Sequence, residues 1–318
     1  MGKEFLKKGS KDQIMNIKGH DLKFTNLEKL YWPKEKISKR DLLNYYYEII
    51  PFILPYLKDR PQSLNRHPNG INGPNFYQKN VEGKVADWLE TYAYRSESDN
   101  QIKQFLVCAD EASLMYTVNL GCIEMNPWHS RIQSPDNPDW CVIDLDPDGN
   151  PFDEVIKTAL TVKEVLDQAG IKGYCKTSGA TGMHIYIPLG ASYSYEQSRS
   201  LAELIVGFVH EKIPSLTSLE RNPVKRKKKI YLDYLQNRST QTIASPYSVR
   251  PRPGATVSTP LHWEELKKGL TPQKFTINNI RIRLKKEGDL FKPVLGKGIN
   301  LEQKLKNLEN INGQAIGK

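Results

Sequence analysis

The stretch DWCVIDLDPDG, residues 139–149, carries two carboxylates one residue apart at the end of an apolar run. Side chains alternate along a strand, so Asp144 and Asp146 would lie on the same face, where their charges repel each other. A divalent ion such as magnesium or manganese, which prefers oxygen ligands, would relieve that repulsion. A strand end followed by an Asp-Pro-Asp-Gly turn explains the same residues equally well. The stretch predicts a buried strand and leaves the metal open. Asp-x-Asp pairs also occur in sugar-nucleotide transferases and nucleases.

The composition is that of a basic protein with enough apolar residues for real cores. The chain has 318 residues, 38% of them hydrophobic, which suits one large domain or two ordinary ones. Its net charge of +10 and pI near 9.2 favour a polyanionic partner. No apolar run approaches the roughly 20 residues that cross a bilayer, and the charged start lacks the apolar part of a signal peptide. Four scattered cysteines fit reduced thiols, so we expect a cytoplasmic protein without a membrane partner.

Turn and helix signals alternate without a regular βαβ repeat, which predicts an α+β fold. A helix should begin at Ser38, because Asp41 three residues later forms a short capping box, and Pro51 and Pro55 should end or kink it. Further helices are expected over residues 151–170 and 194–213, and strands over 76–80, 89–94, 103–109, 113–125, 139–145, 173–179, 183–189 and 229–235.

Two further groups of residues give the aspartate pair a chemical context. Ser178 and His184 lie in KTSGATGMHIYI, residues 176–187, where glycines let the backbone approach a phosphate and Ser and His can donate to its oxygens. Asp233 follows the basic run NPVKRKKKI, residues 222–230. Taken singly, each has a plain structural explanation: a satisfied strand histidine, a salt-bridged aspartate and a solvated loop. Together they predict a two-metal phosphoryl-transfer site whose lysines cover the nucleotide or the template backbone.

As an ordered set, these motifs resemble the polymerase domain of bacterial and archaeal ligase D, the non-homologous end joining polymerase of the archaeo-eukaryotic primase superfamily. The resemblance is carried by RHPNG (66–70), NFYQKN (75–80), NLGCIEMNPWHSR (119–131), DWCVIDLDPDG (139–149), KTSGATGMHIYIPL (176–189), IYLDYLQN (230–237) and TIASPYSVRPRPGATVSTPL (242–261). It implies an α+β primase-polymerase fold with an RRM-like catalytic sheet and a second β-rich lobe. Residues 21–295 would form this domain as two interleaved lobes, after a basic lead-in (1–20) and before a polar tail (296–318).

The resemblance also implies roles for single residues. Asp144, Asp146 and Asp233 match the catalytic and metal-binding triad, which implies two Mn²⁺ or Mg²⁺ ions and NTP or dNTP substrates. The implied nucleotide-binding residues are Ser178, His184, Lys176, Gln236, Arg250, Phe76, Tyr77 and Lys79. The implied DNA-binding residues are Asn26, Lys29, Lys39, Arg66 and Arg226.

Two of these implied groups have a physical explanation. Phe76 and Tyr77 would stack on bases, which tolerates any sequence. Asn26, Lys29 and Lys39 would hold the 5′-phosphate of a downstream strand. Lys39 lies in the first helical turn, against the helix dipole, so an anion held there with free backbone N–H groups would compensate.

Four positions qualify the resemblance. Asn65 stands where relatives often carry a second basic residue, and Thr181 where some carry lysine. Neither departure affects the assignment of the aspartate triad. Asn126 or His129, in the NPWHS segment, would face the nucleotide sugar, and the sequence does not choose between them.

We therefore expect a template-directed nucleotidyltransferase that fills and extends DNA ends and gaps in non-homologous end joining. The resemblance implies a preference for ribonucleotides and manganese. It also implies partners: gapped duplex with a 5′-phosphate, a Ku-like end-binding protein and a DNA ligase module, all at the nucleoid. Two alternatives stay open. A primase would start chains de novo on single-stranded DNA, and a non-catalytic end-binding module would fail in primer extension.

Overall fold

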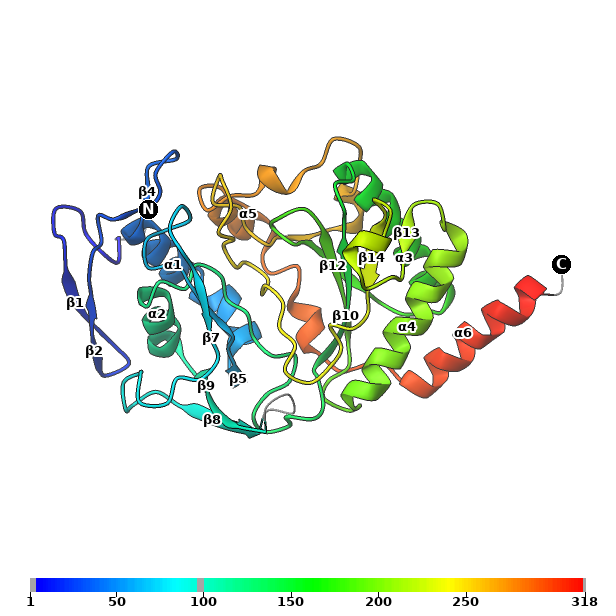
Figure 1. Ribbon diagram of the computed structural model, residues 1–318, viewed down its shortest axis with the longest axis horizontal. Coiled ribbons are helices and arrows are strands. Elements are labelled where there is room, and N and C mark those ends of the chain that lie inside the picture. Colours follow the sequence, from blue (N-terminus) through cyan, green and yellow to red (C-terminus); the bar gives the residue numbers. More distant parts are fainter. Residues whose placement is uncertain (1–3, 96–99, 317–318) are drawn as a thin grey trace. The chain divides into compact units, whose positions relative to one another are not determined.

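The computed structural model describes residues 4–95 and 100–316, which form two compact units (Figure 1). Unit 1 comprises the chain up to residue 133 together with 242–258 and 275–288. Unit 2 comprises 134–241, 259–274 and the chain from residue 289. Both contain helices and strands, as the α+β expectation requires. Within the described residues, no helix combines the length and the apolar character that a membrane crossing needs.

Unit 2 is built on a six-stranded sheet with the order β13-β14-β10-β12-β11-β15. All neighbouring strands are antiparallel except β13 and β14, which are parallel. The expected strands over 139–145, 173–179, 183–189 and 229–235 are all present. The bounds of the six strands are β10 (Trp140–Asp146), β11 (Tyr174–Thr177), β12 (Met183–Pro188), β13 (Thr217–Ser218), β14 (Ile230–Asp233) and β15 (Pro260–Leu261).

Two expected helices cover one face of this sheet (Figure 1). They are α3 (Phe152–Gln168) and α4 (Tyr195–Lys212), and they pack on each other and on β10. The Cys141 thiol of β10 lies 3.5 Å from the carbonyl oxygen of Ser198 in α4, so odd-numbered side chains of β10 face the helices. Even-numbered side chains, Asp144 and Asp146 among them, therefore point to the other face.

In the described part of unit 2, the remaining elements are four short 3-10 helices, labelled η, and one terminal α-helix. They are η1 (Pro223–Lys225), η2 (Trp263–Glu265), η3 (Pro272–Lys274), η4 (Lys292–Leu295) and α6 (Leu301–Ile316). The segment expected to be a polar tail, with a helix as one option, contains the helix α6. Asn307 of α6 donates from its side chain to the carbonyl oxygen of Ala169 at 3.0 Å, just past the end of α3.

Unit 1 contains α1 (Lys39–Leu57), which packs on α2, together with several small sheets. Its other elements are β1 (Gln13–Ile17), β2 (His20–Phe24), β3 (Leu30–Trp32), β4 (Ile37–Ser38), β5 (Arg60–Pro61), β6 (Leu64–Arg66), β7 (Phe76–Gln78), β8 (Thr91–Arg95), β9 (Ile102–Cys108), α2 (Glu111–Asn119) and α5 (Ile280–Glu287). The expected strands over 76–80, 89–94 and 103–109 correspond to β7, β8 and β9. Residues 13–17, inside the expected loose lead-in, pair with β2 as an antiparallel hairpin.

Helix α1 begins as its capping box predicts but does not stop at its prolines. The Ser38 side chain accepts from the Asp41 N–H, and the Asp41 carboxylate accepts from the Ser38 N–H. The helix nevertheless runs through Pro51 and Pro55 to Leu57. Pro51 and Pro55 have no N–H to donate to the carbonyls four residues earlier, those of Tyr47 and Pro51. Tyr47 and both prolines are exposed, so these carbonyls can bind water. Of the two outcomes expected at the prolines, an end or a kink, the end is wrong, because the buried face carries the helix past both residues.

The strand expected over 113–125 is also wrong, since its first half is helix α2. Asp110 is the N-cap and accepts from the Ser113 N–H at 2.9 Å, which starts a helix rather than a strand. Leu114, Met115 and Val118 are buried at helical spacing. The segment after α2 is extended and is fixed by α1, whose Tyr46 hydroxyl donates to the Ile123 carbonyl at 2.7 Å.

Candidate active site

The centre of the candidate site is a single row of side chains across the sheet of unit 2. In the strand register, Asp144 lies opposite Asp233 of β14 on one side and opposite His184 of β12 on the other. His184 in turn lies opposite Lys176 of β11. Residues that face each other across strands point to the same side of a sheet, and so does Asp146, two residues beyond Asp144. Strand pairing therefore places these residues together on one face of the sheet.

Three members of the row contact one another in series. Lys176, which is fully buried, places its Nζ 2.7 Å from His184 Nδ1. His184 Nε2 lies 3.6 Å from Asp144 Oδ1. A protonated Lys176 would donate to Nδ1, and the imidazole would then carry its proton on Nε2, facing the carboxylate. Lys176 thus orients a donor toward the carboxylate face.

Asp233 is bound by hydrogen bonds at both of its carboxylate oxygens. Its Oδ1 accepts from the Leu235 N–H at 2.8 Å and the Tyr231 hydroxyl at 3.3 Å, and its Oδ2 lies 3.4 Å from Gln236 Nε2. Burial is the largest influence and raises the pKa of Asp233, while the bonds from Leu235 and Tyr231 act to lower it. The Gln236 side-chain oxygen is buried and has no partner among the described residues.

Asp146 lies at the open end of β10 and is held by the basic run. Its Oδ2 is 3.2 Å from Arg226 Nη1, and 52% of its side chain is exposed. The Arg226 guanidinium also stacks 4.1 Å above the centre of the Tyr231 ring. It donates to the carbonyl oxygens of Glu220 and Arg221 as well. Tyr231, which the sequence did not single out, thus touches both Arg226 and Asp233.

The carboxylates have the right chemistry for a hard cation but do not converge in this structure. Among the described residues, no three or more His, Cys, Asp and Glu side chains are arranged to hold a metal ion. The oxygens of Asp146 and Asp233 instead contact Arg226, Tyr231, Leu235 and Gln236. Three carboxylates on one face of two paired strands are nevertheless the oxygen donors that Mg²⁺ and Mn²⁺ prefer.

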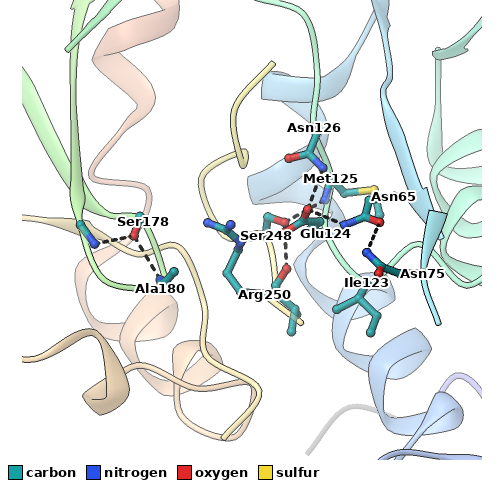
Figure 2. A network of polar contacts seen from close by, with 12 residues as sticks. Asn65, Asn75, Ile123, Glu124, Met125, Asn126, Ser178, Ala180, Ser248 and Arg250 are labelled. Atoms are coloured by element: carbon teal, nitrogen blue, oxygen red, sulfur yellow. Dashed lines mark hydrogen bonds and ion pairs between the residues drawn. The ribbon is translucent and has the colours of Figure 1, made fainter. Parts of the chain in front are cut away.

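The glycine loop between β11 and β12 is closed by Ser178. Its hydroxyl accepts from the N–H groups of Ala180 at 3.1 Å and Gly182 at 3.0 Å (Figure 2). A Cβ at Gly182 would collide with the carbonyl oxygen of Leu145 in β10. This glycine is therefore required for close packing of the loop on β10, a reason other than phosphate approach.

In unit 1, an aromatic pair is exposed on β7. Phe76 is 47% exposed and Tyr77 62%, large fractions for aromatic side chains. Arg66 of β6 lies 5.3 Å from the centre of the Phe76 ring and donates to the Gln78 side chain at 2.9 Å. Lys79, directly after β7, is also exposed. Phe76 and Tyr77 are successive residues of β7, so their rings leave opposite faces of the hairpin, and each is an exposed ring of the kind on which a base can stack.

Arg250 of unit 1 is bound to a buried carboxylate that the sequence did not single out. Glu124 Oε2 accepts from Arg250 Nε at 2.8 Å, and its Oε1 accepts from the amides of Asn65 and Asn126 at 3.1 and 3.2 Å (Figure 2). The only signal was an acidic residue within the apolar NLGCIEM segment. Asn65, noted as a departure from the family, thus has a structural partner.

The remaining predicted DNA-binding residues lie around the start of α1. Lys29 Nζ donates to the Pro68 carbonyl and the Asn69 side chain, each at 3.0 Å. Lys39 is buried, and its Nζ donates to the Asn119 side chain at 2.7 Å. Burial, followed by the charge of Lys29, lowers the pKa of Lys39 to about 8. Asn26, with φ at 56°, is exposed, and its N–H donates to Asp12.

The expected free N–H groups at the start of α1 are not free. The Lys39 N–H donates to the Lys29 carbonyl at 2.8 Å, and the Arg40 N–H donates to the Leu27 carbonyl at 3.0 Å. The Asp41 N–H is bound by Ser38. That part of the 5′-phosphate prediction is wrong, because the preceding chain folds back and satisfies the helix end. An anion here would depend on the lysine side chains.

This fold and this row of residues define a primase-polymerase domain, and three comparisons agree. The model of the LigD primase-polymerase domain matches residues 38–291. The chain is 35% identical over 272 residues to the bifunctional non-homologous end joining protein LigD of Bacillus subtilis, covering 85% of this chain and 43% of that protein. It is 29% identical over 247 residues to the multifunctional LigD of Pseudomonas aeruginosa, covering 77% of this chain and 29% of that protein.

A solved structure, the polymerase domain of Mycobacterium tuberculosis ligase D in complex with DNA, has a TM-score of 0.80 and 25% identity. The alignment covers 87% of this chain and 98% of that domain. The chain belongs to the family of LigD primase-polymerase domains. It spans less than half the length of the two LigD proteins compared here.

Proposed function

We propose that this chain is a template-directed nucleotidyltransferase that fills and extends DNA ends and gaps during non-homologous end joining. The observation that carries the proposal is a row of four side chains across four neighbouring strands: Asp233, Asp144, His184 and Lys176. Asp146 lies on the same face. A pair of carboxylates beside an imidazole and an ammonium suits a reaction in which metal-bound phosphate is attacked by a hydroxyl. Membership of the family of LigD primase-polymerase domains supports the assignment of this reaction to non-homologous end joining.

Asp144, Asp146 and Asp233 would hold two divalent ions, Mn²⁺ or Mg²⁺. When bound, these ions would activate the 3′-hydroxyl and neutralise charge on the triphosphate. A metal ion at Asp146 Oδ2 would displace Arg226, which is already paired with that oxygen. Released Arg226 would then be available to a nucleotide phosphate or the template backbone. The surrounding lysines keep the local potential positive, which favours a polyanion.

The nucleotide would be bound by residues that donate to phosphate oxygens. His184 Nε2 already points to the carboxylate face and is backed by Lys176, so it is oriented for a charge-assisted bond. Ser178 closes the glycine loop beside it in sequence, and Gln236 and Arg250 complete the set taken from the family. The resemblance further suggests that ribonucleotides are preferred to deoxyribonucleotides and manganese to magnesium.

The DNA would be bound by unit 1. Phe76 and Tyr77 would stack on bases, with Arg66 and Lys79 at the phosphates. Lys29 and Lys39 would hold the 5′-phosphate that borders a gap, with Asn26 nearby in sequence. The support is electrostatic: the charge of Lys29 acts to lower the pKa of Lys39, and an anion between them would relieve that repulsion.

The biological context comes from the relatives. Their names describe non-homologous end joining proteins, so a Ku-like end-binding protein and a ligase module are the partners we propose, at DNA ends in the nucleoid. Residues 21–295 would be the primase-polymerase domain itself. The alternative is a primase of the same fold, which starts chains de novo on single-stranded DNA.

The test is extension of a primer on a gapped duplex that carries a downstream 5′-phosphate. NTPs and dNTPs are compared under Mg²⁺ and under Mn²⁺, and a primer-free single strand serves as the second template. We expect extension on the gapped duplex, faster with NTPs and Mn²⁺. Products on the primer-free strand at a comparable rate would assign the chain to priming instead. Absence of products on either template would refute nucleotidyl transfer.

A further inference from the structure

Glu124 is a buried carboxylate surrounded by donors rather than by water. The residue is 5% exposed, and Arg250 and the amides of Asn65 and Asn126 bind its two oxygens (Figure 2). Burying a carboxylate is costly unless hydrogen bonds and a countercharge replace its hydration. Such a site is therefore sensitive to the loss of any one partner.

The charge of Glu124 is fixed by these partners. Burial is the largest single influence and raises its pKa, but the charge of Arg250 and the hydrogen bonds of Asn65, Asn126 and Arg250 outweigh it, so that the pKa is lowered. Glu124 is thus ionised at neutral pH. Its bond to Arg250 Nε, at 2.8 Å, is a charge-assisted contact that sets the plane of the guanidinium.

The same carboxylate is connected to the exposed aromatic hairpin. Asn65 lies opposite Tyr77 in the pairing of β6 with β7, and it accepts from the Asn75 side chain at 3.0 Å. Asn65 therefore joins Glu124 to the residue just before β7. The charge of Glu124 also raises the pKa of Tyr77, second to burial, which shows that its field reaches the hairpin.

We propose that Glu124 is a positioning residue for the nucleotide and template side of the reaction. It holds the Arg250 guanidinium in one orientation and, through Asn65, holds the Phe76–Gln78 strand, so that both are ready before substrate arrives. Glu124 itself touches no substrate. The inference rests on the proposed function, and specifically on a nucleotide contact by Arg250.

The test compares the KM for NTP, the kcat of extension and the affinity for gapped DNA in four variants. Glu124→Gln keeps the shape and removes the charge, so we expect the KM to rise about tenfold or more, with a smaller change in kcat. Arg250→Lys keeps the charge but loses the planar Nε donor. Its KM for NTP should rise about as much as that of Glu124→Gln. The double variant should be no worse than the more affected single one, because both changes break one contact. Glu124→Asp, which keeps the charge on a shorter side chain, should recover part of the loss.

Glu48→Gln is the matched control, since Glu48 pairs with Arg281 on the surface of the same unit. It should leave the KM unchanged. A raised KM in Arg250→Lys with a normal KM in Glu124→Gln would overturn the positioning role while leaving the nucleotide contact intact. Additive effects in the double variant, or a lower Tm with an unchanged KM, would also overturn it. A normal KM in Arg250→Lys, with extension intact, would instead remove the Arg250 contact on which the inference rests.

Discussion

Arg226 Nη1 lies 3.2 Å from Asp146 Oδ2, so the basic run is joined to one of the three candidate metal ligands. A guanidinium and a divalent ion compete for the same carboxylate oxygen. Arg226 is steadied in this position by the Tyr231 ring and two backbone carbonyls. Metal binding should therefore include the release of Arg226.

The first prediction is that Arg226→Ala binds Mn²⁺ more tightly than the wild type in the absence of nucleotide. Asp146 is half exposed, so the pair is screened and the gain should be modest, about two- to fivefold. Electron paramagnetic resonance of free Mn²⁺ measures the affinity. Lys229→Ala is the control, because Lys229 lies in the same run and donates to the Pro214 carbonyl. Equal Mn²⁺ affinity in Arg226→Ala and wild type would show that the pair does not oppose the metal.

The second prediction concerns pH and the 5′-phosphate. Burial and the charge of Lys29 lower the pKa of Lys39 to about 8, so Lys39 loses its proton between about pH 7 and pH 9, where an ordinary lysine stays charged. The phosphate keeps its charge over this range, because its second pKa is about 6. The preference for gapped DNA with a 5′-phosphate over a 5′-hydroxyl should fall with rising pH.

Competition between gapped DNA with a 5′-phosphate and gapped DNA with a 5′-hydroxyl, at about pH 7 and about pH 9, measures this preference. Lys39→Met should have a smaller preference that hardly changes with pH, whereas Lys163→Ala, which alters a surface lysine paired with Asp167, should behave as wild type. A preference that is constant in the wild type, or is retained by Lys39→Met, contradicts the assignment of Lys39.

The same shift predicts a change in stability. The pKa of Lys39 is lower in the folded chain than the value of about 10.4 expected when unfolded, so the unfolded chain binds more protons between these values. The free energy of unfolding of the wild type should rise relative to Lys39→Met between about pH 8 and pH 10. Urea unfolding at both ends of that window measures it. A constant difference would mean that Lys39 is not shifted.

The fourth prediction contrasts two glycines of unit 2. Gly182→Ala would push a methyl group against the Leu145 carbonyl in β10 and should lower the free energy of unfolding by about 1–3 kcal/mol. Gly207 lies within α4 with no outside atom within 4 Å of an added Cβ, so Gly207→Ala should raise it by about 0.5–1 kcal/mol. Urea denaturation compares the two. Equal effects of both substitutions would show that Gly182 is not a packing requirement.

Much of the catalytic row could be predicted from the sequence because it follows from local rules. Alternation along β10 places Asp144 and Asp146 on one face, and motif order brought in His184 and Asp233. The strand partners could not be predicted, because the register Asp144 to Asp233 depends on tertiary packing. Neither could the salt bridge of Arg226 to Asp146, since loop conformation is not encoded in spacing.

The misses have physical causes as well. Residues 113–118 are mostly apolar and contain β-branched types, which resemble a strand, but the Asp110 N-cap makes them a helix. Glu124 was missed because a lone acid in an apolar segment gives no sign of its donors, two of which, Asn65 and Arg250, come from distant parts of the chain. The position of Lys39 in the first turn predicts free N–H groups at the start of α1, but the carbonyls of residues 27 and 29 fold back and accept from them.

The most direct test of the central claim, that the carboxylate row of unit 2 transfers nucleotides, is single-nucleotide extension of a gapped duplex by Asp144→Ala. We expect no detectable product and unchanged affinity for the duplex, because the DNA contacts proposed lie on other residues. Asp167→Ala, a surface carboxylate of α3, should extend as the wild type does. Normal extension by Asp144→Ala would contradict the account, since no other part of it supplies the chemistry.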